Sequence, residues 1–150
     1  MKPRIYIDTS VIGGNFDEEF KDESIKFFNR IERKDFEVYF SEVNEAELSL
    51  APDHIKEIKN KIPQECYNYL ELTEEVRDLA NAYINNKVLG HASLNDAYHI
   101  AFASVYRLDV LVSWNFKHIV KLKTKNIVKM VNTLQKYKNI EIITPAEILD

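Results

Sequence analysis

The segment from residue 93 to residue 115 constrains the fold more than any other part of this sequence. Residues 93–107 repeat apolar and small side chains at helical spacing, and Val110–Val112 forms a continuous apolar run. A run of this kind is typical of a strand covered on both faces, as in a parallel sheet. The segment therefore predicts a helix with Asp96 in its first turn, then a buried strand, then a polar turn at Asn115.

Other short apolar segments predict four more strands, separated by amphipathic segments that predict helices. The strands are expected at residues 4–7, 36–40, 67–72 and 140–143. The helices are expected at residues 22–33, from Ser41 to before Pro52, around Ile55–Ile62, from Thr73 to Ile84, around Ile127–Leu134 and from Thr144 onward. This alternation predicts an α/β fold, a three-layer α/β/α sandwich around a mainly parallel five-stranded sheet.

Some local expectations follow from residue chemistry. Ile25 and Leu134 should lie on the apolar faces of their helices. Gly13-Gly14-Asn15 predicts a loop. Two helices fall between the third and fourth strands, which leaves two arrangements open. Either the connector at residues 85–92 carries the chain back across the sheet, or one helix lies across its top.

Length and composition indicate one folded domain over residues 1–150. The chain is 45% hydrophobic with 3 Gly and 4 Pro, and it has no internal repeat or flexible linker. Its single cysteine, Cys66, excludes an intrachain disulfide and fits a reducing compartment, so a cytoplasmic location is expected. Residues 1–10 contain no long apolar stretch, so we expect neither a signal peptide nor a membrane span.

The formal net charge is −4, but the charges are unevenly distributed. Residues 16–47 contain eleven acidic side chains and five Lys or Arg, whereas residues 110–140 contain seven Lys and no acid. Two solvated faces would explain this asymmetry. An acidic site beside a basic track that binds a polyanion is the other explanation, so both interpretations stay open.

Four oxygen-bearing side chains are expected to converge on one edge of the sheet. Asp8 ends the first strand, Glu47 lies in the helix after the second, Asp96 opens the helix before the fourth, and Asn115 follows the fourth. In a parallel sheet these positions share the edge at which ligands bind. The four are far apart in sequence, so local capping does not explain the set.

Carboxylates crowded together repel unless a cation lies between them, and hard oxygen ligands suit Mg²⁺ or Mn²⁺. Such a cation can bind a phosphate oxygen and activate a water, which points to metal-dependent phosphodiester hydrolysis. Nucleophilic catalysis is less supported, because Cys66 has no histidine near it in sequence. The four histidines show no His-x-x-x-His spacing either.

Each member of the set also has a purely structural interpretation. Asp8 could begin an Asx-type turn, Asp96 could partner a Ser93 cap, and Asn115 could be a turn residue. Glu47 competes with Glu45 and Glu42, and for each of the three the alternative is that it only solvates the helix surface. Three nearby residues are expected to be structural: Trp114 and His99 as packing residues, and Asp109 as a strand-entry cap.

Four segments resemble the PIN domain, particularly the VapC-like toxins of toxin–antitoxin pairs. They are Tyr6-Ile7-Asp8-Thr9-Ser10-Val11, the stretch from Phe40 to Leu48, the stretch from Asn95 to Ala103, and Asp109-Val110-Leu111-Val112-Ser113-Trp114-Asn115. Their order and spacing extend the resemblance over nearly the whole chain.

The resemblance implies a Rossmann-like sandwich and an Mg²⁺- or Mn²⁺-dependent endoribonuclease that hydrolyses RNA phosphodiester bonds. It implies Asp8 and Asp96 as metal ligands, with Glu47 completing the set. Asn115 occupies the place where many members carry an acid, so a second metal loses a charged ligand here. The resemblance further implies a homodimer and a type II antitoxin partner.

Two alternatives come from other classes of function. The first is a catalytically weakened PIN-fold module that binds RNA or protein, suggested by the neutral Asn115 and the acidic net charge. The second is a small-molecule phosphohydrolase. It is disfavoured because Asp8-Thr9-Ser10 lacks a second acid two residues on, and because the chain has no glycine-rich phosphate loop.

Overall fold

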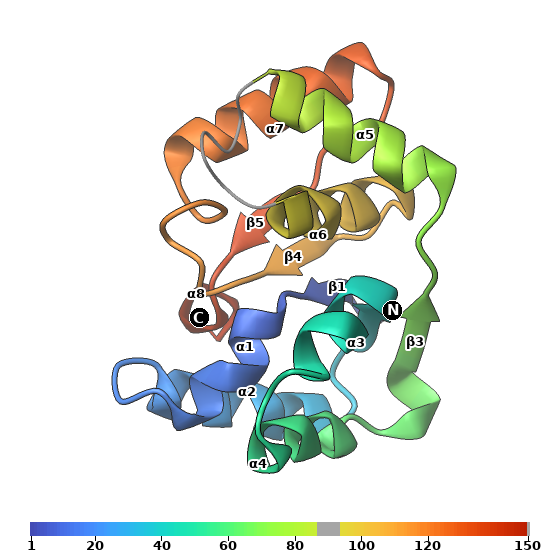
Figure 1. The fold of residues 1–150 in the computed structure, drawn as a ribbon. Helices are drawn as coiled ribbons and strands as arrows, with labels where there is room; N and C mark the ends of the chain where they lie inside the picture. Colours follow the sequence, from blue (N-terminus) through green and yellow to red (C-terminus); the bar gives the residue numbers. More distant parts are fainter. Residues whose placement is uncertain (87–93, 150) are drawn as a thin grey trace.

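A computed structural model describes residues 1–86 and 94–149. The described residues form a five-stranded sheet in the order β3-β2-β1-β4-β5, with every neighbouring pair parallel (Figure 1). The strands are β1 (Arg4–Ile7), β2 (Glu37–Ser41), β3 (Tyr67–Leu70), β4 (Val110–Val112) and β5 (Glu141–Ile143). The predicted α/β fold with a parallel five-stranded sheet is thus confirmed.

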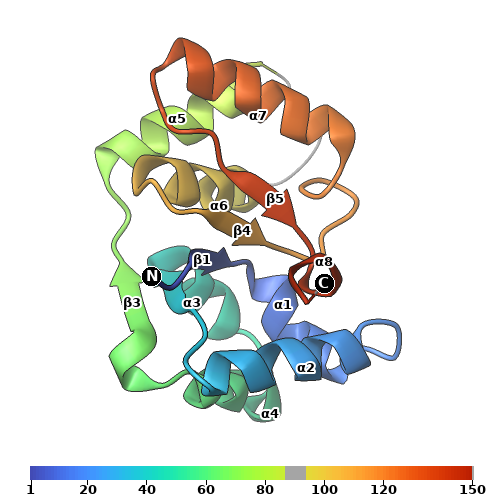
Figure 2. The same cartoon turned by 180° about the vertical axis from the view of Figure 1, so that it is seen from behind.

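Helices cover both faces of the sheet. The α-helices are α1 (Thr9–Gly13), α2 (Lys21–Glu32), α3 (Glu42–Leu48), α4 (Asp53–Lys56), α5 (Glu74–Asn85), α6 (Leu94–Val105), α7 (Leu122–Leu134) and α8 (Pro145–Ile148). Short 3₁₀ helices are η1 (Gly14–Phe16), η2 (Glu57–Lys61) and η3 (Gln64–Cys66). Helices α5, α6 and α7 lie on one side of the sheet and α1, α2 and α4 on the other, as both views show (Figures 1 and 2). None of the helices in the described ranges is long and apolar enough to cross a bilayer.

Strand alternation divides the core into two layers. Tyr6 of β1 and Leu111 of β4 face the layer under α5, α6 and α7. Ile5, Ile7 and Val112 face the opposite layer, under α1 and α2. Successive side chains of a strand point to opposite faces, so the central strands β1 and β4 contribute to both cores. This is the reason why the Val110–Val112 run is apolar throughout.

The chain passes from β3, at one edge of the sheet, to β4 in its interior. Helices α5 and α6 pack against each other on the same face, and the chain returns over the sheet to place β4 beside β1. Most of the connector predicted at residues 85–92 lies outside the described residues, as does the proposed Ser93 cap.

Side-chain caps begin three helices at the residues where the sequence predicts the helices to start. Thr73 accepts a hydrogen bond from the Val76 N–H, and Thr144 forms a capping box with Glu147. Ser41 accepts from the backbone at the start of α3, and the Asn44 side chain accepts from the Ser41 N–H at 2.8 Å. Each capping box satisfies backbone donors that a helix end would leave unpaired.

The loop predicted at Gly13-Gly14-Asn15 is wrong, because these residues lie in α1 and η1. The Asn15 side chain donates to the carbonyls of Val11 and Ile12, which closes the helical turn. Gly14 is required by packing. A Cβ there would lie 2.6 Å from Ser24 Oγ and 2.8 Å from the Trp114 ring.

Three further local predictions need correction. Ile25 is 38% exposed and Leu134 75% exposed, so neither lies on the buried face of its helix. Phe27, which is fully buried, fills the core where Ile25 was expected. The helix expected around Ile55–Ile62 is broken into α4 and the 3₁₀ helix η2.

Candidate metal centre

The candidate site lies where β1 and β4 end side by side. From β1 the chain proceeds to β2 on one side, and from β4 it proceeds to β5 on the other. Connections that diverge in this way leave a crevice at the carboxyl ends of the strands, where open α/β sheets bind ligands. Asp8 directly follows β1, and its N–H donates to the carbonyl of Val112 in β4 at 3.0 Å.

Asp8 is held by one of its two carboxylate oxygens. The Ser10 and Ser113 hydroxyls both donate to Oδ2 at 2.7 Å. The other oxygen, Oδ1, lies 3.4 Å from Nε2 of His99. Asp8 is only 5% exposed, so its position is well defined by these contacts. The two serines therefore engage Oδ2, and Oδ1 is the oxygen that faces His99.

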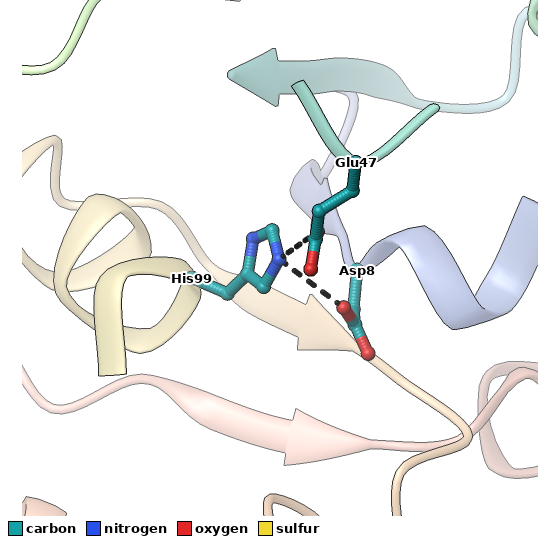
Figure 3. Close-up of side chains that lie close together, drawn as sticks. All are labelled: Asp8, Glu47 and His99. Carbon is teal, nitrogen blue, oxygen red and sulfur yellow. Dashed lines mark hydrogen bonds and ion pairs between the residues drawn. The ribbon is translucent and has the colours of Figure 1, made fainter. Parts of the chain in front are cut away.

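Glu47, in the last turn of α3, points toward Asp8 (Figure 3). The Thr9 hydroxyl and His99 Nε2 each lie 2.7 Å from Oε1, and Asn95 Nδ2 lies 3.4 Å from Oε2. Burial acts to raise the pKa of Glu47. The hydrogen bond and charge of His99, with the hydrogen bonds from Thr9 and Asn95, outweigh burial and hold that pKa below its ordinary value.

The competing acids of α3 point elsewhere. Glu45 forms an ion pair with Lys59 at 2.6 Å, and Glu42 accepts from the Leu72 N–H at 2.8 Å. Glu47 is therefore the acid of this helix that the structure brings to Asp8.

Asp96 and Asn115 complete the set of four at this edge. Asn115 Nδ2 donates to Asp96 Oδ1 at 3.2 Å, while Asn115 Oδ1 accepts from the His118 N–H at 2.9 Å. Burial, followed by the negative charge of Asp8, raises the pKa of Asp96 above its ordinary value. Among the described residues, ligand atoms of Asp8 and Glu47 lie within 4.8 Å of each other, in a group that does not include Asp96. Asp96, bonded to Asn115, is close enough for the charges of Asp8 and Glu47 to act on its carboxyl.

His99 is a site residue that sequence reasoning missed. It was expected to be a packing residue, but it is fully buried with both ring nitrogens in polar contacts. Nδ1 lies 2.6 Å from the Tyr6 hydroxyl, and Nε2 faces Glu47 and Asp8. Burial acts to lower the pKa of His99, but the hydrogen bond to Glu47 and the charges of Asp8, Glu47 and Asp96 raise it above the ordinary value.

The signal for His99 was present in its spacing from Asp96. Residues three apart on a helix share one face, and a carboxylate and an imidazole at this spacing converge on metals in helical bundles. A search for His-x-x-x-His alone passes over an Asp-x-x-His pair.

Trp114 and Asp109, which were also expected to be structural, do have structural roles. Trp114 stacks on Phe20 with ring centroids 4.3 Å apart, and its Nε1 donates to Ser24 Oγ at 2.8 Å. Asp109 accepts from the Arg4 N–H at 2.8 Å as β1 begins.

The donor set fits a divalent cation. Ligand atoms of Asp8, Glu47 and His99 all lie within 4.8 Å of one another, and the Asp96 carboxyl experiences the charges of Asp8 and Glu47. Carboxylate oxygens suit a cation such as Mg²⁺ or Mn²⁺, which would relieve the repulsion among the carboxylates, while both nitrogens of the adjacent His99 ring are engaged by Tyr6 and Glu47.

Comparison with known proteins agrees with this architecture. A solved structure described as FitAcB from Neisseria gonorrhoeae has a TM-score of 0.59 at 16% identity, covering 94% of this chain and 97% of that chain. A structure of VapBC2 from Rickettsia felis, bound to a DNA fragment from their promoter, has a TM-score of 0.56 at 13% identity, covering 94% and 98%. A comparison with curated proteins finds no match. The family model described as PIN domain matches residues 5–118, most of the chain. This chain belongs to the PIN domain family.

Proposed function

We propose that this protein is a divalent-metal-dependent endoribonuclease. The observation that carries the proposal is the cluster of Asp8, Glu47 and His99 at the switch point of a PIN-domain sheet, with the Asp96 carboxyl close enough to experience the charges of both acids. Three acids from separate elements, two of them aimed at each other across one imidazole, are costly to hold together without a cation. Metal-assisted hydrolysis of a phosphodiester is the chemistry that suits this set.

Different residues would bind the cation and orient its ligands. Asp8 and Glu47 would hold the cation, each anchored through one oxygen by neighbouring donors. Asp96 would be the third ligand, oriented by Asn115. A bound cation supplies Lewis-acid stabilisation of phosphate charge and lowers the pKa of a coordinated water.

The RNA backbone would lie along lysines that follow the site. These are Lys117, Lys121, Lys123, Lys125 and Lys129. Among the described residues, no ion pair engages any of the five, so their charge is available to phosphates. Binding through such contacts weakens as salt is added, which makes the salt dependence a direct test.

We further propose that the protein is the toxin of a type II toxin–antitoxin pair, acting in the cytoplasm as a homodimer. The VapC-like motifs and the likeness of the fold to the FitAcB and VapBC2 structures support this reading. A short neighbouring gene that encodes a DNA-binding protein would supply the antitoxin.

One observation favours a second function, a PIN-fold binding module with weakened catalysis. Asn115 is neutral, and both of its side-chain polar atoms are engaged, one by Asp96 and one by the His118 N–H. Calorimetric titration separates the two functions, because a module would bind no Mn²⁺ at millimolar concentration.

The decisive experiment measures cleavage of single-stranded RNA with Mg²⁺, Mn²⁺ or EDTA. We expect metal-dependent cleavage that falls by roughly 10²–10³-fold in Asp8→Asn, since a charged ligand contributes several kcal/mol. Glu45→Gln is the matched control, because Glu45 lies on the same helix but pairs with Lys59. Equal cleavage by Asp8→Asn would refute the proposal, and activity on a nucleotide monophosphate but not on RNA would favour a phosphohydrolase.

A further inference from the structure

The carboxylates of Asp8 and Glu47 are bound in the same asymmetric way. Each has one oxygen that accepts from two donors within 2.7 Å: Oδ2 of Asp8 from two serines, and Oε1 of Glu47 from Thr9 and His99. The second oxygen of each has only a longer contact, at 3.4 Å. Saturating one oxygen and leaving the other accessible fixes a carboxylate as a single-oxygen ligand.

The donors to Glu47 can be traced back to the start of its own helix. Asn44 Nδ2 donates to Thr9 Oγ1 at 2.9 Å, so the Thr9 proton is directed to Glu47 Oε1. This first branch connects the third residue of α3 to the carboxylate in its last turn.

A second branch runs through Tyr6 and His99. Ser41 Oγ accepts from the N–H groups of Val43 and Asn44, which occupies both of its lone pairs. Its proton is shared between Asn44 Oδ1 at 3.2 Å and the Tyr6 oxygen at 2.7 Å, and the Tyr6 hydroxyl in turn lies 2.6 Å from Nδ1 of His99. With Nδ1 accepting, Nε2 carries the ring proton and donates it to Glu47 Oε1.

The donation from Nε2 does not depend on the charge of the ring. The neutral Nε2–H tautomer and the imidazolium both carry this proton, and a carboxylate can only accept. The Nε2–H donation to Oε1 is therefore present in either state, whereas Nδ1 accepts from Tyr6 in the neutral ring and donates to the Tyr6 oxygen in the imidazolium. The ring cannot turn away, because it is fully buried beside Tyr6, with ring centroids 5.5 Å apart.

We propose that His99 is a positioning residue of the metal centre, which ends a hydrogen-bond chain from the Ser41 cap through Tyr6 and saturates Oε1 of Glu47, so that Glu47 presents Oε2 to the cation. This inference rests on the proposed function, since it assigns how one ligand of that site is held. It adds Tyr6, Thr9 and the capping box of α3 to the residues on which metal affinity depends.

The test is the affinity of the purified protein for Mn²⁺, measured by calorimetry, in two substitutions of one side chain. His99→Leu retains the bulk and removes the donor, whereas His99→Gln can place an amide N–H near the position of Nε2. We expect His99→Leu to weaken Mn²⁺ binding by roughly 10–100-fold, as for other residues that orient a ligand, and His99→Gln to recover most of the loss.

A merely structural histidine gives a different result. Both variants would then lose thermal stability, and the folded fraction would bind Mn²⁺ as tightly as the wild type, which would overturn the proposal. If His99→Leu does not fold, Tyr6→Phe replaces it, with an expected loss of about tenfold in affinity. Tyr83→Phe is its control, since that buried hydroxyl contacts Ser104 and Asn132 and none of the residues of the metal centre. Unchanged affinity in Tyr6→Phe would equally overturn the proposal.

RNA cleavage separates this inference from the proposed function. Wild-type protein that binds Mn²⁺ but leaves RNA intact would refute the nuclease and leave the positioning role standing. Metal-dependent RNA cleavage by the wild type, together with full Mn²⁺ affinity in His99→Leu, would support the nuclease and refute the positioning role of His99.

Discussion

Two buried polar clusters, each built around a tyrosine, differ in whether they leave hydrogen-bond acceptors without a close donor. The closed cluster consists of Tyr83, Ser104 and Asn132, from α5, α6 and α7, and all three are fully buried. The Tyr83 hydroxyl lies 2.5 Å from Asn132 Oδ1 and 3.0 Å from Ser104 Oγ, and Asn132 Nδ2 donates to Ser104 at 2.9 Å. The cluster carries no formal charge, and its partners lie within the protein.

The open cluster consists of Tyr6, His99, Glu47 and Asp8, and it lies at the carboxyl edge of the sheet. Its tyrosine is equally buried, but its hydrogen bonds end on two carboxylates that each retain an oxygen with acceptor capacity. A neutral, satisfied cluster holds helices together. A charged cluster with leftover acceptors at an edge has the properties of a ligand site.

The largest effect should come from breaking the closed cluster. Asn132→Ala removes the partner of Tyr83 and Ser104 in a fully buried place, so we expect a loss of about 3 kcal/mol in the free energy of unfolding. Urea denaturation followed by circular dichroism measures it. Mn²⁺ affinity of the folded protein should not change. A joint loss of stability and metal binding would erase the distinction between the clusters.

Metal should stabilise the protein through the open cluster. At a concentration about 100 times the dissociation constant, a bound cation adds roughly 2.7 kcal/mol, which corresponds to roughly 5–10 °C in Tm. Differential scanning fluorimetry with Mn²⁺ and with EDTA tests this. The shift should persist in Asn132→Ala and vanish in Asp8→Asn. A shift that survives in Asp8→Asn would place the cation elsewhere.

A smaller effect is expected from the serine that anchors Asp8. Ser113→Ala removes one of the two hydroxyls on Oδ2, so Asp8 can rotate and Mn²⁺ affinity should fall about tenfold. Calorimetry provides the measurement. Ser49→Ala is a matched control, because that hydroxyl bonds only to the exposed Ala46 carbonyl. Equal affinities in the two variants would argue against orientation by Ser113.

The smallest effect concerns pH and Asp96. Burial and the charge of Asp8 raise its pKa, so ionised Asp96 is less favourable in the folded metal-free protein than in the unfolded chain. Stability from this group is present at low pH and is lost as pH rises through the raised pKa. In EDTA near pH 7, Asp96→Asn should therefore raise Tm by about a degree or two. A lower Tm in the variant would contradict this.

The open cluster could be predicted in part from the sequence. Asp8 and Glu47 are placed by the rule that the carboxyl ends of parallel strands and the helices that follow them share an edge. His99 and Tyr6 were missed because their contact joins side chains 93 residues apart, on a strand and a helix. Sequence periodicity shows that Tyr6 faces one core, but not which helix lies above it.

The same limit explains the errors elsewhere. The chemistry of glycine predicts a loop at Gly14. In the structure, the missing Cβ of Gly14 instead leaves room for the side chains of Ser24 and Trp114. The closed cluster likewise depends on how α5, α6 and α7 are stacked, which no local pattern contains. Elements and their order follow from local spacing, while contacts between elements require the packed structure.

Helix α3 carries its cap and its carboxylate only two turns apart, and both are tied to the same buried imidazole. Each residue of an α-helix advances the side-chain direction by about 100° and 1.5 Å. Inserting or deleting a single residue between Ser41 and Glu47 would swing the acid out of the crevice even if every other side chain were preserved. Homologous chains that keep this centre should therefore vary in composition on the outer side of α3, yet never in its length.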